Sequence, residues 1–138
     1  MKQYLLILVF IFLLGCDPTD DRLTIVNESN DDVFYSLSIN DTVTNNPVRI
    51  LDSKDTIWRE SNIILTNTFI RHSLIGPNEW EYFINRNCED STLRVFIFKK
   101  EFILNTSWDS IVAKQTYSKK YKLTVKDLDK LNWRVTYP

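Results

Sequence analysis

A run of ten apolar residues, Leu5 to Leu14, follows Lys2 near the start of this 138-residue chain. A helix needs about 20 apolar residues to span a bilayer, so the run is too short for a stable transmembrane anchor. A positive residue followed by a short apolar stretch is typical of a secretory signal peptide. Small Gly15 before Cys16 suits a peptidase that requires a small residue at its cleavage site. We therefore expect residues 1–15 to be removed, which leaves 123 residues to fold.

The segment Leu13-Leu14-Gly15-Cys16 resembles the lipobox of bacterial lipoprotein signal peptides. The resemblance implies that Cys16 carries a diacylglycerol thioether and that its new amino terminus is open to acylation. Two or three acyl chains hold a protein on a membrane stably, whereas one chain does not. The alternatives are an ordinary cleaved signal with a coincidental cysteine, and a membrane-spanning helix.

Residues 16–22 contain three acids and Pro18, a composition that predicts a solvated tether ahead of a single domain over residues 23–138. Acids close to a lipidated cysteine resemble the surface-export signals of Bacteroidota-type lipoproteins. In enterobacterial-type lipoproteins, by contrast, Asp directly after the cysteine is associated with retention at the inner membrane. We expect an outer-membrane protein that faces outward, and a periplasm-facing protein is the second alternative.

Charge and glycine content exclude several classes of function. The formal net charge of −1 becomes −2 when Lys2 is removed, and nucleic-acid binding requires a strongly basic face. Only two glycines are present, so no Gly-rich phosphate-binding loop is available for a nucleotide. We expect no nucleic-acid partner and no cofactor.

Short segments of alternating apolar and polar residues predict a fold that is mainly β. Residues 23–27 and 33–39 are separated by the turn cluster 28–32, which predicts a hairpin, and the apolar segment 93–98 predicts a central strand. Further strands are expected at 48–51, 56–58, 63–65, 68–70, 117–125 and 133–137. The closing stretch 120–138 also resembles the endings of small uncharacterised lipoproteins of the same bacterial group, and that resemblance implies no activity.

Three short helices are expected in the connections. Gly76-Pro77-Asn78 opens one that places Trp80, Phe83 and Ile84 on one face. Ser107 is positioned to cap a second helix. Thr124 with Asp127 resembles a capping box for a last helical turn, from which Leu128 and Leu131 face inward. The expected fold is therefore α+β: a small antiparallel β-sandwich or sheet with two or three short helices in the connections.

No catalytic or metal-binding pattern stands out. Cys88 remains after Cys16 is lipidated, and its polar neighbours predict partial exposure. An inert thiol, an intermolecular disulfide and a nucleophile are the alternatives for Cys88, although the single histidine, His72, has no spacing typical of a Cys-His pair. One histidine and one cysteine cannot by themselves form a zinc site, and no calcium-binding loop is present. We expect the chain not to be an enzyme.

The four tryptophans differ in their sequence surroundings. Trp80, Trp108 and Trp133 lie in apolar patterns and are expected to pack in the core. Trp58 has charged neighbours on both sides, so it is either a residue that stacks on a ligand such as a sugar or half-buried packing.

A short motif, Asp followed by Ser or Thr and then Ile, Val or Thr, occurs four times. It is similar to the O-glycosylation sequon of Bacteroidota exported proteins. The resemblance implies four candidate sites: Thr42, Thr56, Ser91 and Ser110. Because the modification needs an exposed hydroxyl, Thr42 and Ser91, which are expected in loops, are the better candidates.

Two functions are compatible with these features. The first is a lipid-anchored, non-catalytic binding or accessory module displayed on the outer membrane, with a glycan or a protein as its ligand. The alternative is a membrane-anchored immunity or inhibitor-type protein that binds another protein. The oligomeric state and the identity of the partner do not follow from the sequence.

Overall fold

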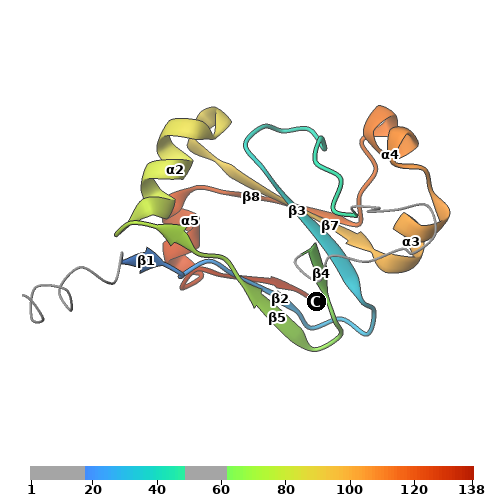
Figure 1. The fold of residues 1–138 in the computed structure, drawn as a ribbon, viewed down its shortest axis with the longest axis horizontal. Helices are drawn as coiled ribbons and strands as arrows, with labels where there is room; N and C mark the ends of the chain where they lie inside the picture. The colour runs from blue at the N-terminus through green and yellow to red at the C-terminus, as the bar shows by residue number, and fades with distance from the viewer. Residues whose placement is uncertain (1–17, 49–61) are drawn as a thin grey trace, which may run out of the picture.

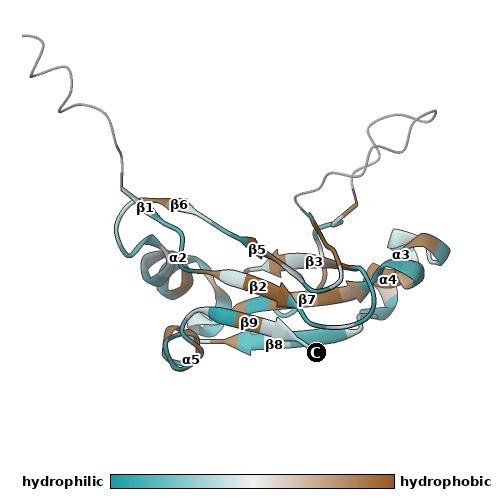
Figure 2. Cartoon of the chain, turned by 90° about the horizontal axis from the view of Figure 1, so that it is seen from below, coloured by the Kyte–Doolittle hydropathy of each residue, from teal (hydrophilic) through white to brown (hydrophobic). Residues whose placement is uncertain are grey.

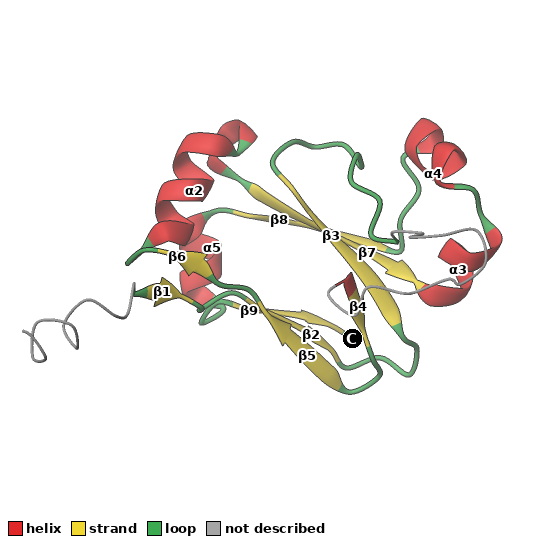
Figure 3. Cartoon of the chain, in the orientation of Figure 1, coloured by secondary structure: helices red, strands yellow, loops and turns green. Residues whose placement is uncertain are grey.

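The computed structural model describes residues 18–48 and 62–138, which form nine strands and four α-helices (Figures 1 and 3). The strands are β1 (Thr19–Asp20), β2 (Thr24–Asn27), β3 (Val33–Ser38), β4 (Ile63–Ile64), β5 (Thr68–Arg71), β6 (Leu74–Ile75), β7 (Leu93–Lys99), β8 (Lys119–Leu123) and β9 (Arg134–Tyr137). The helices are α2 (Glu79–Asn87), α3 (Lys100–Asn105), α4 (Trp108–Lys114) and α5 (Val125–Lys130), and a short 3-10 helix, η2, spans Glu89–Ser91. This small α+β fold, mainly β, confirms the expected fold class. The strands expected at 48–51 and 56–58 lie almost entirely outside the described residues.

The largest sheet has the strand order β4-β3-β7-β8 and is antiparallel throughout. β3 and β7 pair over six residues, from Val33 opposite Lys99 to Ser38 opposite Arg94. Every residue of β7 except Lys99 is buried. The expectation of a central strand at 93–98 is confirmed, and its apolar character, interrupted only by Arg94, reflects burial on both faces.

The second sheet has the order β5-β2-β9, and in it β2 runs antiparallel to β5 but parallel to β9. The predicted hairpin of residues 23–27 with 33–39 is therefore wrong, because β2 and β3 lie in different sheets. Buried Asn27 explains the divergence. Its side chain donates to the carbonyls of Asp31 and Ile64, and its amide oxygen accepts from the Ser29 backbone, so the turn carries the chain from one sheet to the other.

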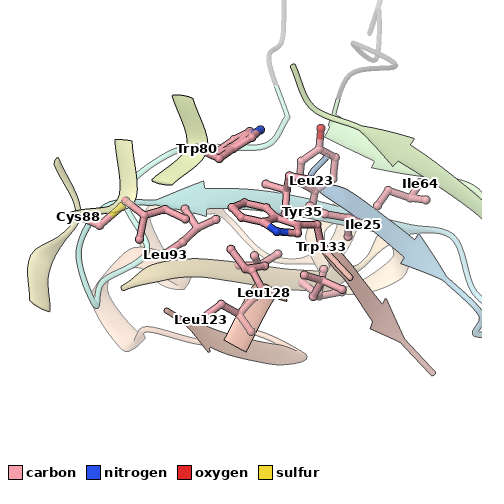
Figure 4. Close-up of a cluster of buried hydrophobic side chains, with 14 of the residues drawn as sticks. Leu23, Ile25, Tyr35, Ile64, Trp80, Cys88, Leu93, Leu123, Leu128 and Trp133 are labelled. Atoms are coloured by element: carbon pink, nitrogen blue, oxygen red, sulfur yellow. The ribbon is translucent and has the colours of Figure 1, made fainter. Parts of the chain in front are cut away.

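Alternation along β7 divides the core into two clusters, one on each face of the large sheet. Leu93, Val95 and Ile97 belong to the cluster that includes residues of β2, β9, α2 and α5, and Figure 4 shows Leu93 within it. Phe96 and Phe98 point to the other face, where α3, α4 and the loop after β3 cover them. The helices gather at the two ends of the molecule, α2 and α5 at one and α3 and α4 at the other (Figure 1).

Two of the predicted helix caps are present. The Ser107 hydroxyl accepts from the backbone N–H of Ser110, and Thr124 and Asp127 form a reciprocal capping box. Asp at this position can replace the usual Glu or Gln because its carboxylate reaches the Thr124 backbone N–H at 3.1 Å. Leu128 is buried as expected, but Leu131 is exposed because α5 ends at Lys130 before its side chain can turn inward.

The predicted tether does not extend to Arg22. Thr19 and Asp20 form β1, which pairs with β6, and the Gly76 backbone N–H donates to the Pro18 carbonyl at 2.7 Å. Asp20 is only 5% exposed. The acidic segment after Cys16 is therefore part of the fold from Thr19 onward, and the single domain begins earlier than expected.

Candidate functional site

A cavity of about 240 Å³ lies beside α2. Its walls come from the end of β3, the segment that joins β5 to β6, the first two turns of α2 and the start of β7. The lining residues are Leu37, Ser38, Ile39, His72, Ser73, Leu74, Trp80, Phe83 and Leu93. None of them is Asp, Glu, Lys or Arg, so the cavity suits a neutral ligand. Its volume is below the ~300–1,000 Å³ of common ligand sites, so that ligand would be small.

His72 and Trp80 are the polar aromatic residues of this cavity. The His72 backbone N–H donates to the Leu23 carbonyl at 2.9 Å, and Trp80 in α2 is 2% exposed. Their rings meet edge to face, with centroids 6.5 Å apart, and the series continues to Tyr35 at 5.2 Å from His72 and to Phe83 at 5.9 Å from Trp80. Edge-to-face contacts of this kind stabilise aromatic pairs by about 0.5–1.5 kcal/mol beyond burial.

Nε2 of His72 and Nε1 of Trp80 are buried without a hydrogen-bond partner among the described residues. An unpaired buried polar group costs about 1–3 kcal/mol. Burial also lowers the pKa of His72 below its ordinary value. The ring is therefore neutral at neutral pH, and the cavity holds a single uncharged imidazole rather than an acid–base pair.

The pKa of His72 makes the stability of the fold depend on pH. Because His72 is the only histidine, no other side chain with an ordinary pKa titrates between about pH 5 and 7. The unfolded chain takes up a proton as the pH falls through about 6.5, while the folded chain stays neutral to a lower pH. We expect the free energy of unfolding, measured with urea, to decrease between about pH 7 and about pH 5. His72→Gln should remove this decrease, and an equal decrease in both proteins would contradict the assignment.

The N-terminal segment holds α2, and with it Trp80, in place. Asn78 precedes α2 in a left-handed conformation and makes no side-chain cap bond. The Asp20 carboxylate supplies the missing bond, because it accepts from the Trp80 backbone N–H at 3.0 Å. Arg22 donates to Asp20 at 2.7 Å and also to Glu81, and its side-chain hydrogen bond is the main reason that the pKa of Asp20 is lowered. Residues remote in sequence thus perform the capping of this helix.

Arg22 also lies over the ring of Trp133, with its guanidinium carbon 4.2 Å from the ring centroid. The indole N–H of Trp133 donates to Asp129 at 2.9 Å. Contact between a guanidinium and an indole face is attractive and partly desolvated here. Arg22 consequently links the segment around β1 to α2 and to the turn before β9.

A second cluster of charged groups surrounds Arg94, whose side chain is 3% exposed. Its guanidinium donates to the carbonyls of Ile39, Glu89 and Thr92 and lies 3.5 Å from the Asp41 carboxylate. Asp41 also contacts two lysines, Lys120 at 3.2 Å and Lys122 at 2.9 Å. The hydrogen bond from Lys122 is the main cause that lowers the pKa of Asp41 to about 2. Arg94 belongs to β7, whereas Ile39 and Asp41 belong to the loop after β3. The cluster therefore holds this loop on β7.

The residues singled out from the sequence are scattered over the chain. Cys16, Thr56 and Trp58 lie outside the described residues. Thr42 is exposed in the loop after β3, and Ser91 is exposed at the end of η2. Ser110 is half-buried in α4 and its hydroxyl accepts from Ser107 at 2.8 Å. Thr42 and Ser91 therefore meet the exposure that O-glycosylation requires better than Ser110 does.

Cys88 is buried, 7% exposed, which corrects the expectation of partial exposure. Its neighbours are polar, but Cys88 ends α2 and its side chain turns into the core beside Leu93 (Figure 4). Burial is the main cause that raises the pKa of its thiol. A buried thiol with a raised pKa favours the inert alternative over a nucleophile.

The sequence predicts the burial of the core tryptophans better than it predicts the cavity. Trp80 and Trp133 are buried, and Trp108 packs half-buried against Phe98 with ring centroids 5.9 Å apart. The pairing of His72 with Trp80 was missed, because four separate segments form the cavity and no local pattern joins them. In the described part of the chain no group of three or more His, Cys, Asp or Glu is placed to hold a metal ion.

Comparison with known proteins found no matching family model, curated protein or solved structure. Across residues 18–48 and 62–138 no helix has the length and apolar character needed to cross a bilayer.

Proposed function

We propose that this chain is a lipid-anchored, non-catalytic binding module of the cell envelope, displayed on the outer surface of the outer membrane. The observation that carries the proposal is the segment Leu13-Leu14-Gly15-Cys16 after a short apolar run. The small neutral cavity beside α2 supports a binding role, because its only group that titrates near neutral pH is His72. A general acid–base mechanism requires positioned groups of suitable pKa, which this lining does not supply.

A second candidate function is favoured by the segment that runs from β4 through β5. Leu65 and Phe69 are exposed there, Phe69 at 59%, beside a recess of about 390 Å³ whose lining is apolar except for Thr68. Exposed apolar side chains that gather on one surface are typical of a protein-binding site. This favours an immunity or inhibitor-type protein that captures another protein. An adjacent toxin or protease gene would support this candidate, and a polysaccharide-use cluster would support a glycan ligand, for which Trp58 is the candidate stacking residue.

The test of the anchor is the variant Cys16→Ala. We expect the unaltered protein to incorporate an alkyne analogue of palmitate and to partition into the detergent phase of Triton X-114 extracts. Cys16→Ala should lose both properties completely, because the thioether cannot form without the thiol. Intact-mass measurement gives the number of acyl chains and, in the same spectrum, any hexose on Thr42 or Ser91.

Cys88→Ala is the matched control, since it removes the other cysteine and should leave labelling unchanged. Absence of label from the unaltered protein would refute the anchor. Protease treatment of whole cells tests the address separately, because an outward-facing protein is cleaved and a periplasm-facing one survives.

A further inference from the structure

We propose that the β1–β6 edge of the fold lies directly on the lipid bilayer, with Ile75 in contact with the membrane interface. The inference rests on the proposed lipid anchor at Cys16 and adds to it the orientation of the domain. The partner is a lipid surface, and the contact is made by a specific end of the molecule.

Chain length limits how far this edge can move from the anchor. Only Asp17 and Pro18 separate Cys16 from Thr19, the first residue of β1. A fully extended chain spans at most ~3.6 Å per residue, so the Cα atoms of Cys16 and Thr19 are at most about 11 Å apart. A lipidated cysteine lies at the level of the headgroups, and β1 is therefore held close to them whatever conformation the intervening residues adopt.

The strand pairing places an apolar side chain at the same position. Thr19 is the direct antiparallel partner of Ile75, and such partners have Cα atoms about 4.5–5.5 Å apart. Together the two distances put Ile75 within about 17 Å of the anchored cysteine. On the neighbouring pair the side chains face inward, because Asp20 is buried and Leu74 packs on the core. Thr19 and Ile75 consequently point outward together.

Ile75 is 75% exposed, the highest value among the exposed large apolar side chains of the described residues. It is flanked by Pro18 and Pro77, both exposed, and β1 and β6 lie side by side at one end of the molecule (Figure 2). Two charged residues next to this edge, Asp21 and Arg71, pair with each other at 3.5 Å, and one acid, Glu79, follows it at the start of α2. An exposed isoleucine is costly in water and favourable at the headgroup–acyl boundary.

The orientation can be measured by site-specific fluorescence in reconstituted vesicles. Full-length acylated Ile75→Cys is labelled with the environment-sensitive dye NBD and placed in vesicles of phosphatidylethanolamine and phosphatidylglycerol with a doxyl-labelled lipid. Leu104→Cys is the matched control, because Leu104 is a half-exposed apolar residue of α3 at the opposite end of the molecule. Buried Cys88 stays in place. Absence of label on the unaltered protein checks that neither native cysteine reacts with the dye.

We expect a blue shift and strong doxyl quenching for the label at position 75 and neither for the label at 104. A flexible Gly/Ser insert of about 20 residues between Asp17 and Pro18, whose root-mean-square span is roughly 25 Å, should reduce quenching at 75 severalfold. Vesicle flotation and intact mass report the anchor independently. Acylated protein that floats but shows equal or no quenching at both positions overturns the orientation alone, and protein that is not acylated overturns the anchor and this inference together.

Discussion

Replacing Arg94 with methionine should lower the free energy of unfolding by about 2–4 kcal/mol, because the buried guanidinium is a charged donor to three carbonyls and each such hydrogen bond contributes about 1.5–3 kcal/mol. Methionine fills much of the same volume but donates no hydrogen bond. The carbonyls of Ile39, Glu89 and Thr92 then lose their shared charged donor, although those of Ile39 and Glu89 each keep a backbone N–H. Urea unfolding followed by tryptophan fluorescence measures the difference.

Lys122→Met is the matched control for the Arg94 variant. Lys122 pairs with the same carboxylate, that of Asp41, but its side chain is half-exposed. Exposed ion pairs contribute about 0–1 kcal/mol, so this variant should be close to the unaltered protein. Arg94→Lys should fall between the two, because an ammonium keeps the charge but lacks the planar guanidinium that reaches several carbonyls at once. Equal losses for Arg94→Met and Lys122→Met would show that the buried guanidinium does not hold the loop.

Features set by neighbouring residues could be predicted from the sequence. The cap at Ser107 and the Thr124–Asp127 box depend on groups three residues apart, and both are present. Asn132, just after α5, has a φ of 50°, the left-handed conformation that Asn tolerates at helix ends. The alternation of 33–39 and the apolar run 93–98 correctly marked strands β3 and β7, because the period of the side chains is a local property.

Features set by distant pairing could not be predicted. β2 pairs in parallel with β9 at the far end of the chain, and the pattern of residues 23–27 is equally compatible with a local hairpin. Asp20 looked like a tether residue because its neighbours are polar, yet its partners Trp80 and Arg22 place it inside the fold. The cavity shows the same limit, since His72 and Trp80 approach each other only after β5, β6 and α2 have packed.

Asp20→Ala is the second substitution with a large expected effect, a loss of about 2–3 kcal/mol in the free energy of unfolding. The carboxylate performs two tasks. It accepts the Trp80 backbone N–H at the start of α2, and loss of such a cap costs about 0.5–2 kcal/mol. It also pairs with Arg22, which among the described residues would keep Glu81 as its acid partner. Asp20→Asn should cost less than Asp20→Ala, because the amide oxygen can still accept from Trp80.

The neighbouring acid separates this structural role from export. Asp21→Ala removes the same charge one residue later, but the side chains of Asp21 and Arg71 are both more than half exposed, so its loss should change stability by less than about 1 kcal/mol. If the export machinery recognises the acidity of the segment after Cys16, the two variants should reduce protease-accessible protein on whole cells equally, while only Asp20→Ala lowers the urea midpoint. Equal stability of both variants would contradict the capping role of Asp20. Surface display that falls only for Asp20→Ala would mean that this acid serves the fold and not the export signal.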